Sequence, residues 1–253
     1  MITVTPLRPD DLDATTTLHL QHLRMGLFPK LGGAFMRRYQ ESFARSPYGI
    51  ALVARDEGRV IGALFATTSN SAHYRWVVRN QGWRLGTSGL AALATRPLLA
   101  LRFLATRGPR YARAISRRLA PASEVAPRAN RDGPLSVLSH IVVDADARRR
   151  GVGRTLVRAF ARQAREEGAR RALLVTEEGG LGTGFFERIG ARLLAQRRGQ
   201  DGSLVREYRL ILGETPAYER IERDRGGRTF VRSYHPGGGA IAGLSAASGR
   251  RAG

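Results

Sequence analysis

The stretch that decides the fold is Leu135 to Ala191, which begins LSVLSHIVV (135–143) and continues DADARRRGVGR (144–154). The first nine residues are rich in β-branched side chains, as in a strand, and the next part is a polar turn with two glycines. From Val152 onward apolar side chains recur every four residues, which predicts an amphipathic helix ending at Gly168. A second strand is predicted at 172–176 and a short helix at 183–189. The stretch therefore predicts a β-α-β-α unit.

The junction between this first strand and helix suits a bound anion. The first N–H groups of a helix have no partner within the helix, and the helix dipole places partial positive charge there. Gly151 and Gly153 carry no side chain that would keep an anion from the backbone. Fixed positive charge comes from Arg148, Arg149, Arg150 and Arg154. The pattern is neither a Walker A loop, because the only lysine is Lys30, nor a G-x-G-x-x-G fingerprint, because position 156 is Leu.

Two motifs carry a resemblance to a known family. The motif Arg148-x-x-Gly151-x-Gly153, after a strand that ends Val142-Val143-Asp144, resembles the acetyl-CoA motif of the GNAT N-acyltransferase superfamily. Residues 185–191, FFERIGA, are similar to that family's late helix and the strand after it. The order of elements matches too, so the resemblance covers roughly Met1 to Leu212 apart from an insertion.

The resemblance implies an acyl-CoA site. It places the pantetheine arm along the strand and the pyrophosphate on the turn, with acetyl-CoA or another acyl-CoA as co-substrate. The residues implied in binding it are Ile141, Val142, Val143, Arg148, Arg149, Arg150, Gly151, Val152, Gly153 and Arg154. The loop Leu27 to Gly33 would border the acceptor substrate, or it is an ordinary solvent loop.

The expected fold class is α/β, with a mixed, mostly antiparallel sheet of six or seven strands flanked by helices. Residues 2–5 predict a strand, 9–25 a helix, 35–43 a second helix, and 49–55 with 59–67 a hairpin. Residues 192–200 and 203–212 predict a closing hairpin. We expect one GNAT domain at 1–212 with an insertion at 70–130. Residues 213–253, rich in small residues and helix breakers, predict a mostly disordered tail.

Composition excludes several classes of protein. The chain has 253 residues and no cysteine, which excludes disulfide and thiolate chemistry. The sequence predicts no signal peptide and contains no run of ~18 apolar residues that could span a membrane. A cytoplasmic location is therefore the expectation. The formal net charge of +21 predicts a surface that attracts phosphates, nucleic acid or anionic lipid.

The insertion at 70–130 is strongly basic, with eleven arginines and one acidic residue, Glu124. Two or three helices are expected there, with a break at Gly86 to Gly89 and an amphipathic helix after Pro109. Three roles remain open: a helical elaboration packed on the core, a membrane-surface patch, or a surface for an acidic or nucleic-acid substrate. We favour the first, with its arginines framing a cleft for an anionic acceptor.

The residues usual for catalysis in the family are absent. The positions of the glutamate base and the tyrosine acid are occupied by Val137 and Phe186. Either solvent takes the acceptor's proton while positioning supplies catalysis, or other residues substitute, or the fold binds acyl-CoA without turnover. Glu177, at the end of the second strand, and His140, beside the pantetheine segment, are the weak candidates for catalytic residues.

The remaining polar residues give no further site. A structural role is the simpler expectation for His140, which by strand alternation would face away from Val137 and Ser139. His19, His22 and His73 have no predicted role, and no spacing suggests a metal site, so no metal is expected. The predicted function is acyl-CoA-dependent transfer to an amine acceptor. The alternative is a catalytically weak acyl-CoA-binding, or membrane- or nucleic-acid-associated, module.

Overall fold

The computed structural model describes residues 1–23, 28–98, 100–101, 135–178, 180–198 and 204–212, and two strands at 218–223 and 229–234. The chain forms two compact units, Met1–Leu212 and Gly213–Gly253. In the second unit, β8 (Tyr218–Arg223) and β9 (Thr229–Tyr234) form an antiparallel pair, which the sequence analysis did not predict.

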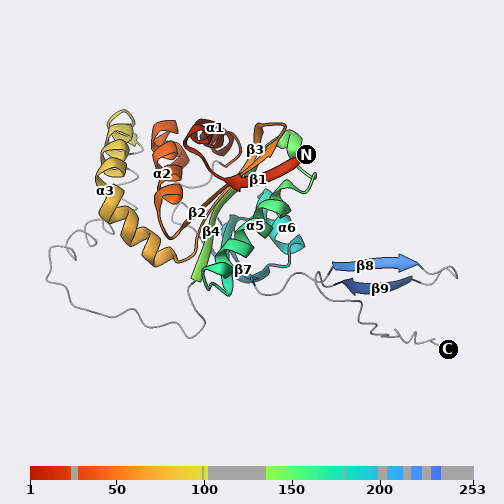
Figure 1. Ribbon diagram of the computed structural model, residues 1–253. Coiled ribbons are helices and arrows are strands. Elements are labelled where there is room, and N and C mark those ends of the chain that lie inside the picture. Colours follow the sequence, from red (N-terminus) through yellow and green to blue (C-terminus); the bar gives the residue numbers. More distant parts are fainter. Residues whose placement is uncertain are drawn as a thin grey trace. The chain divides into compact units, whose positions relative to one another are not determined.

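The first unit is built on one seven-stranded sheet with the order β1-β2-β3-β4-β5-β7-β6 (Figure 1). Only β4 and β5 run parallel, and the other pairs are antiparallel. The predicted mixed, mostly antiparallel sheet is therefore confirmed. The strands are β1 (Ile2–Pro6), β2 (Gly49–Asp56), β3 (Arg59–Thr67), β4 (Leu135–Val143), β5 (Arg171–Glu177), β6 (Arg192–Arg198) and β7 (Leu204–Ile211).

Helices cover both faces of the sheet. On one face lie α1 (Leu12–His22) and α2 (Gly33–Arg45), and α3 (Asn70–Ala94) packs against α2. The other face carries α5 (Val152–Glu166) and α6 (Leu181–Arg188). Short 3-10 turns occupy Pro9–Asp11, Phe28–Leu31 and Ala145–Ala147.

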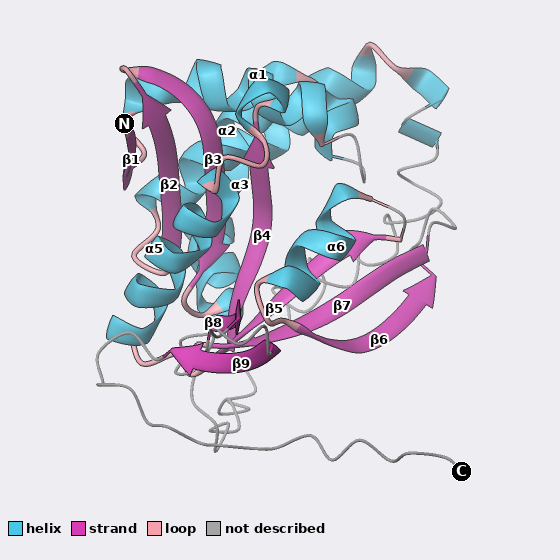
Figure 2. Cartoon of the chain, turned by 90° about the vertical axis from the view of Figure 1, so that its right-hand side faces the viewer, coloured by secondary structure: helices cyan, strands magenta, loops and turns pink. Residues whose placement is uncertain are grey.

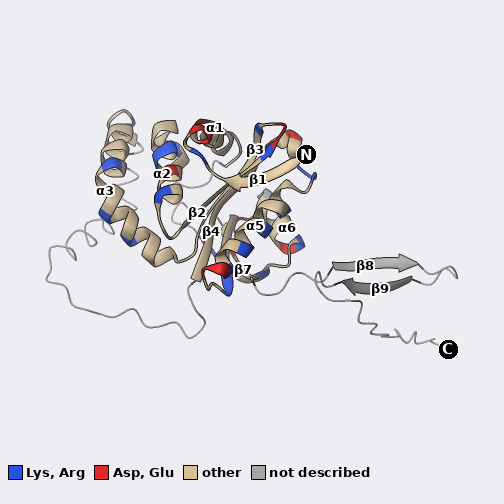
Figure 3. Ribbon diagram, in the orientation of Figure 1, with Lys and Arg blue, Asp and Glu red and all other residues tan. Residues whose placement is uncertain are grey.

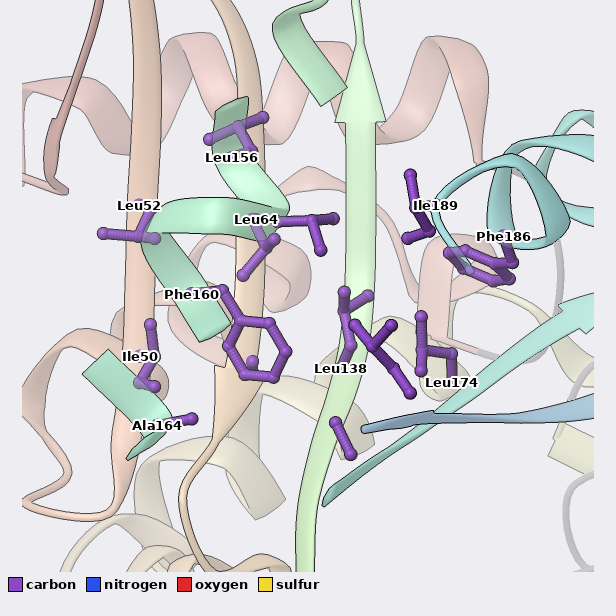
Figure 4. Packing of buried hydrophobic residues seen from close by; sticks show 14 of the residues in the cluster. Ile50, Leu52, Leu64, Leu138, Leu156, Phe160, Ala164, Leu174, Phe186 and Ile189 are labelled. Atoms are coloured by element: carbon purple, nitrogen blue, oxygen red, sulfur yellow. The ribbon is translucent and has the colours of Figure 1, made fainter. Parts of the chain in front are cut away.

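Two buried clusters hold these layers together. The cluster on the α5 side includes Leu64 and Leu138 from the sheet, Phe160 from α5 and Phe186 from α6 (Figure 4). The four residues whose spacing predicted α5 are all buried, namely Val152, Leu156, Phe160 and Ala164. The cluster on the α2 side includes Met36, Tyr39 and Phe43 from α2 with Phe65 from β3. Helices α2 and α5 therefore each bury an apolar face, as amphipathic helices do.

An irregularity in β4 shapes the middle of the sheet. His140 pairs with Phe65 of β3 and Leu138 pairs with Ala66, so Ser139 is an extra, unpaired residue. Such a β-bulge bends the strand that carries it. The parallel pairing with β5 also ends at Leu138, which pairs with Leu174, and the two strands then diverge (Figure 2).

The first part of the insertion is helix α3, which runs unbroken through Gly86 to Gly89. The predicted break there is wrong, because an α-helix tolerates isolated glycines when its neighbours keep packing. The buried side chains of α3 are His73, Val77, Gln81 and Ser88, while Trp83 is 83% exposed. Figure 3 shows basic residues and no acidic ones along the ribbon of α3. The helix predicted after Pro109 lies outside the described residues.

Across the part of the chain that is described, no helix combines the length and the apolar character needed to cross a membrane.

Candidate functional site

The turn between β4 and α5 ends in a helix N-terminus without a cap. Arg149 and Gly151 both adopt left-handed backbone conformations, with φ of 61° and 83°. Gly151 precedes the helix and offers no side-chain cap, and the first bond within the helix is Thr155 N–H to the Gly151 carbonyl at 3.0 Å. The N–H groups of Val152 and Gly153 come before that bond and have no helical acceptor. They form an electropositive end of the kind that binds phosphate.

The arginines of this turn have different partners. Arg148 donates from Nε to the Val143 carbonyl at 3.3 Å and from Nη2 to His22 Nδ1 on α1 at 3.1 Å. Because a guanidinium cannot accept, Nδ1 of His22 is the acceptor in that contact. Arg150 donates to Asp56 at 2.6 Å. Arg149 is exposed and has no carboxylate partner among the described residues, so its charge is available to a ligand.

Asp56, at the end of β2, holds Arg150 in place. Its pKa lies below the ordinary value, because it accepts hydrogen bonds from the N-terminal amino group and from Arg150. The β2–β3 hairpin also supplies Arg59, which donates to Asp144 at 2.9 Å. The turn is thus tied to the hairpin at two points, and none of these partners was predicted from the sequence.

The two glycines of the motif have different surroundings. A Cβ at Gly151 would meet nothing within 4 Å, whereas a Cβ at Gly153 would lie 3.1 Å from the ring of Phe185 on α6. The sequence analysis assigned both glycines to close approach of an anion. The structure gives Gly153 a second reason to lack a side chain, which is the packing of α6 against the start of α5.

The edge of β4 beyond the bulge faces no strand. Residues 139–143 have no partner in β5, whose last residues pair only with β7. Ile141 and Val143 pack toward the α5 cluster, and Val142 packs into the α2 cluster. The three residues expected to meet pantetheine therefore lie on a free strand edge that leads into the turn. Free N–H and C=O groups on such an edge can pair with an extended ligand, while the Val143 carbonyl already accepts from Arg148.

His140 lies on this edge, with its side chain on the α2 face of the sheet. Its Nε2 is 3.3 Å from the Tyr39 hydroxyl, and its ring is 4.8 Å from that of His19. Burial and then the nearby His19 lower the pKa of His140 to about 3, and burial lowers the pKa of His19 to about 4. Both imidazoles are therefore neutral near pH 7.

The expectation that His140 faces away from Val137 is wrong, and the bulge is the reason. Leu138 packs into the α5 cluster, so its neighbour Val137 faces the α2 side. The extra residue at Ser139 shifts the alternation by one, which turns His140 to the α2 side as well. Val137 and His140 thus share a face.

The positions where the family has its acid and base give no catalytic group. Phe186 is 2% exposed and packs against Tyr208, with ring centroids 5.8 Å apart. Glu177 is exposed at the end of β5. Glu178 pairs with Arg206 at 2.8 Å. Of the loop expected to border the acceptor, Leu27 lies outside the described residues, and Phe28–Leu31 forms a 3-10 turn.

Comparisons with known proteins agree with this geometry. The family model described as the acetyltransferase (GNAT) family matches residues 116–191. Among proteins with curated descriptions, none matches this sequence. The solved structures include SsHAT, at 21% identity and a TM-score of 0.51 over 84% of this chain and 99% of that one.

Two further structures resemble this chain. A protein of the GNAT family from Desulfovibrio desulfuricans has 13% identity and a TM-score of 0.50, over 84% of this chain and all of that one. The protein yncA from Salmonella typhimurium, solved with its cofactor acetyl-CoA, has 14% identity and a TM-score of 0.49, over 85% and 96% of the two chains. The likeness to SsHAT and to the Desulfovibrio protein shows the fold alone, because both identities are low. The predicted resemblance to the GNAT superfamily is confirmed, and the chain has the GNAT fold.

Proposed function

We propose that this protein is an acyl-CoA-dependent N-acyltransferase that moves an acetyl or other acyl group from CoA directly to an amine. The observation that carries the proposal is the uncapped start of α5, which lies directly after the free edge of β4. The anion site at the start of α5 suits the pyrophosphate of CoA. The free edge of β4, which directly precedes it in the chain, suits the amide-bearing pantetheine arm. Acetyl-CoA would be the co-substrate.

The reaction requires little covalent chemistry from the protein. The amine nitrogen attacks the thioester carbonyl carbon, the carbon–sulfur bond breaks, the amine loses a proton, and the thiolate takes one up. A backbone N–H on the free edge of β4 can donate to the carbonyl oxygen as negative charge develops there. Holding amine and thioester in contact supplies much of the remaining rate enhancement.

Among the described residues, no side chain in the proposed site is suited to act as a strong general base. His140 is the nearest imidazole, but a group whose pKa is about 3 cannot hold a proton taken from an ammonium ion. We therefore propose that the acceptor loses its proton to solvent. His140 and Tyr39 would then orient the neutral amine by hydrogen bonds on the α2 face.

Charge reversal at the turn tests the proposed cofactor site. Arg149→Glu places a carboxylate beside the pyrophosphate at an exposed position, and we expect acetyl-CoA affinity to fall at least about tenfold, or ~1.4 kcal/mol. Arg162→Glu is the matched control. Arg162 is also exposed, but it lies on α5, ten residues or about 15 Å beyond Val152, the first residue of that helix. Calorimetry on both folded variants decides. Equal affinity in Arg149→Glu and the parent protein would reject the site.

The alternative is a fold that binds acyl-CoA without effective catalysis, and Val137 with Phe186 favours it. A screen of amine acceptors, followed by free-thiol release from acetyl-CoA, separates the two. Tight acetyl-CoA binding with no release for any acceptor class would favour the binding module over the enzyme.

The insertion supports a second kind of partner. Trp83 and Leu90 are 83% and 68% exposed on α3, next to Arg75, Arg79 and Arg84. Exposed aromatic and aliphatic groups beside arginines suit an anionic membrane surface, and arginines alone suit nucleic acid. We propose that the insertion mainly serves an anionic acceptor and that an anionic membrane or a nucleic acid is an additional partner. We also propose that the protein acts in the cytoplasm. Loss of sedimentation with anionic liposomes in Trp83→Ser would identify the membrane.

A further inference from the structure

A pocket lies between the start of α2 and the inner face of α3. Its volume is about 520 Å³, and it is lined by residues 31–35, by Thr87, Ser88, Ala91 and Ala92 of α3, and by Arg38 and Arg96. The insertion forms one whole wall of it. Pockets of this size hold small molecules or the end of a larger one.

The charges of the pocket are all positive. Arg38 and Arg96 line it, no acidic residue does, and neither guanidinium pairs with a carboxylate among the described residues. Arg96 is held over the start of α2 by bonds from Nη1 to the carbonyls of Leu31 at 3.5 Å and Ala92 at 3.3 Å. Two guanidiniums without counter-ions favour an anionic ligand.

The start of α2 adds N–H donors to the same wall. Gly32 precedes the helix without a side-chain cap, and the first bond within the helix is Met36 N–H to the Gly32 carbonyl at 3.0 Å. Gly32 has a φ of 90°, and a Cβ there would lie 3.5 Å from Arg96 Nη2. The positive φ favours glycine at this position, whereas a Cβ would make only an ordinary contact with the arginine.

The side chain of Ser88 adds a hydroxyl to the pocket wall. Ser88 is 7% exposed and lines the pocket from α3. Its neighbour Thr87 bonds back to the carbonyls of Trp83 and Arg84, whereas the Ser88 hydroxyl forms no hydrogen bond with the described residues. A hydroxyl that lines a pocket without a partner among the described residues can donate a hydrogen bond to a bound oxyanion.

One face of α2 connects the pocket to the proposed reaction centre. Phe35, which lines the pocket, stacks on Tyr39 with ring centroids 6.4 Å apart, and Tyr39 lies 5.5 Å from the ring of His140. The ring centroids of Phe35, on the pocket wall, and of His140, on β4, are thus at most about 12 Å apart.

We infer that this pocket binds an oxyanion, a carboxylate or a phosphate, of the amine acceptor, about 10 Å from the amine that is acylated. The inference rests on the proposed function and names its substrate class. An amino acid is too short, because its carboxylate lies next to its amine. An extended acceptor fits, such as a peptide whose third residue is acidic, because each extended residue spans about 3.4 Å.

Matched acceptors test the pocket directly. The first pair is a pentapeptide amide with a free N-terminus and aspartate at its third position, and the same peptide with asparagine. The second pair is a long-chain aminoalkyl phosphate and the corresponding alcohol. Affinities are measured by calorimetry with excess CoA present, so that an anion cannot occupy the turn before α5. We expect the acidic member of at least one pair to bind about tenfold more tightly.

Three variants locate the effect. Arg38→Gln with Arg96→Gln should bring the affinity ratio near one, and Ser88→Ala should lower it. Arg79→Gln, which removes an exposed α3 arginine outside the pocket, should leave it unchanged. Ratios near one in the parent protein, or a ratio that survives the double substitution, overturn the inference.

The same measurements separate this inference from the proposed function. CoA binding and acylation of both peptides with equal efficiency would leave the function intact and reject the pocket. A clear preference for the acidic peptide without any CoA binding would reject the function and keep the pocket as an anion site.

Discussion

Buried histidines make the stability of the first unit depend on pH. Burial lowers the pKa of His73 to about 4, and its ring stacks on Phe43 at 4.6 Å. Nδ1 of both His19 and His73 has no partner among the described residues, so neither ring has a favourable way to carry a second proton. Because these pKa values are lower in the folded state than in the unfolded state, the unfolded chain binds more protons between pH 4 and 6.5. Stability is therefore complete above about pH 6.5 and is lost as pH falls toward 4.

Replacement of one buried histidine tests this dependence. His73→Phe keeps the ring contact with Phe43 and removes the titrating group. We expect the free energy of unfolding to decline less steeply below pH 6, by about 1 kcal/mol per pH unit. Urea unfolding at several pH values between 4.5 and 7 measures the slope. Parallel slopes in the two proteins would show that His73 is protonated equally in both states.

Sequence patterns predicted the residues of the turn but not their partners. The glycines and arginines after β4 form a recognisable local motif, and its helix starts where the motif predicts. His22 and Asp56 are 126 and 94 residues away from the arginines they contact, so no local pattern could reveal them. The face of His140 was missed because alternation assumes a regular strand, and the bulge interrupts it.

At the level of elements, two glycines differ in the space that is available for a side chain. A Cβ at Gly49, where β2 begins, would lie 2.1 Å from the Phe43 carbonyl oxygen at the end of α2. At Gly86, within α3, a Cβ would meet nothing within 4 Å. Gly49→Ala should therefore lower the free energy of unfolding by at least ~2 kcal/mol, and Gly86→Ala should raise it by about 0.5–1 kcal/mol.

Urea denaturation of both variants at pH 7 measures these effects. Unchanged m values would confirm that stability and not compactness has changed. A neutral Gly49→Ala would mean that the end of α2 can move away from β2, and a destabilising Gly86→Ala would mean that α3 is not helical at that point.

The helices and strands of the core were predicted because their periodicities are strong. The expected hairpins, the motif strand and α5 all lie within a few residues of the observed bounds. The prediction of a break in α3 failed because glycine is a signal of interruption only when nothing else holds the helix. Here His73, Val77, Gln81 and Ser88 keep one face of α3 buried along its length.

At the scale of the whole molecule, the opening between β4 and β5 depends on one residue. Deletion of Ser139 would join Leu138 to His140, which already face opposite sides, so both flanks could keep their packing. We expect such a variant to fold and to lose most of its affinity for acetyl-CoA, because a regular β4 could continue to pair with β5. Calorimetry and thermal unfolding measure the two properties separately. Undiminished affinity in a folded deletion variant would show that the bulge does not create the site.

The bulge also explains the opening as a matter of unequal lengths. The paired stretches of β3 and β4 differ in length. Gly62 to Thr67 of β3 contains six residues, whereas Val137 to Val143 of β4 contains seven over the same span. The surplus is one residue, about 3.3 Å of chain. When two paired strands differ in length over the same span, the longer strand must bend. This bend carries β4 away from β5. One extra residue in the β3–β4 pair therefore separates the strands of the neighbouring β4–β5 pair.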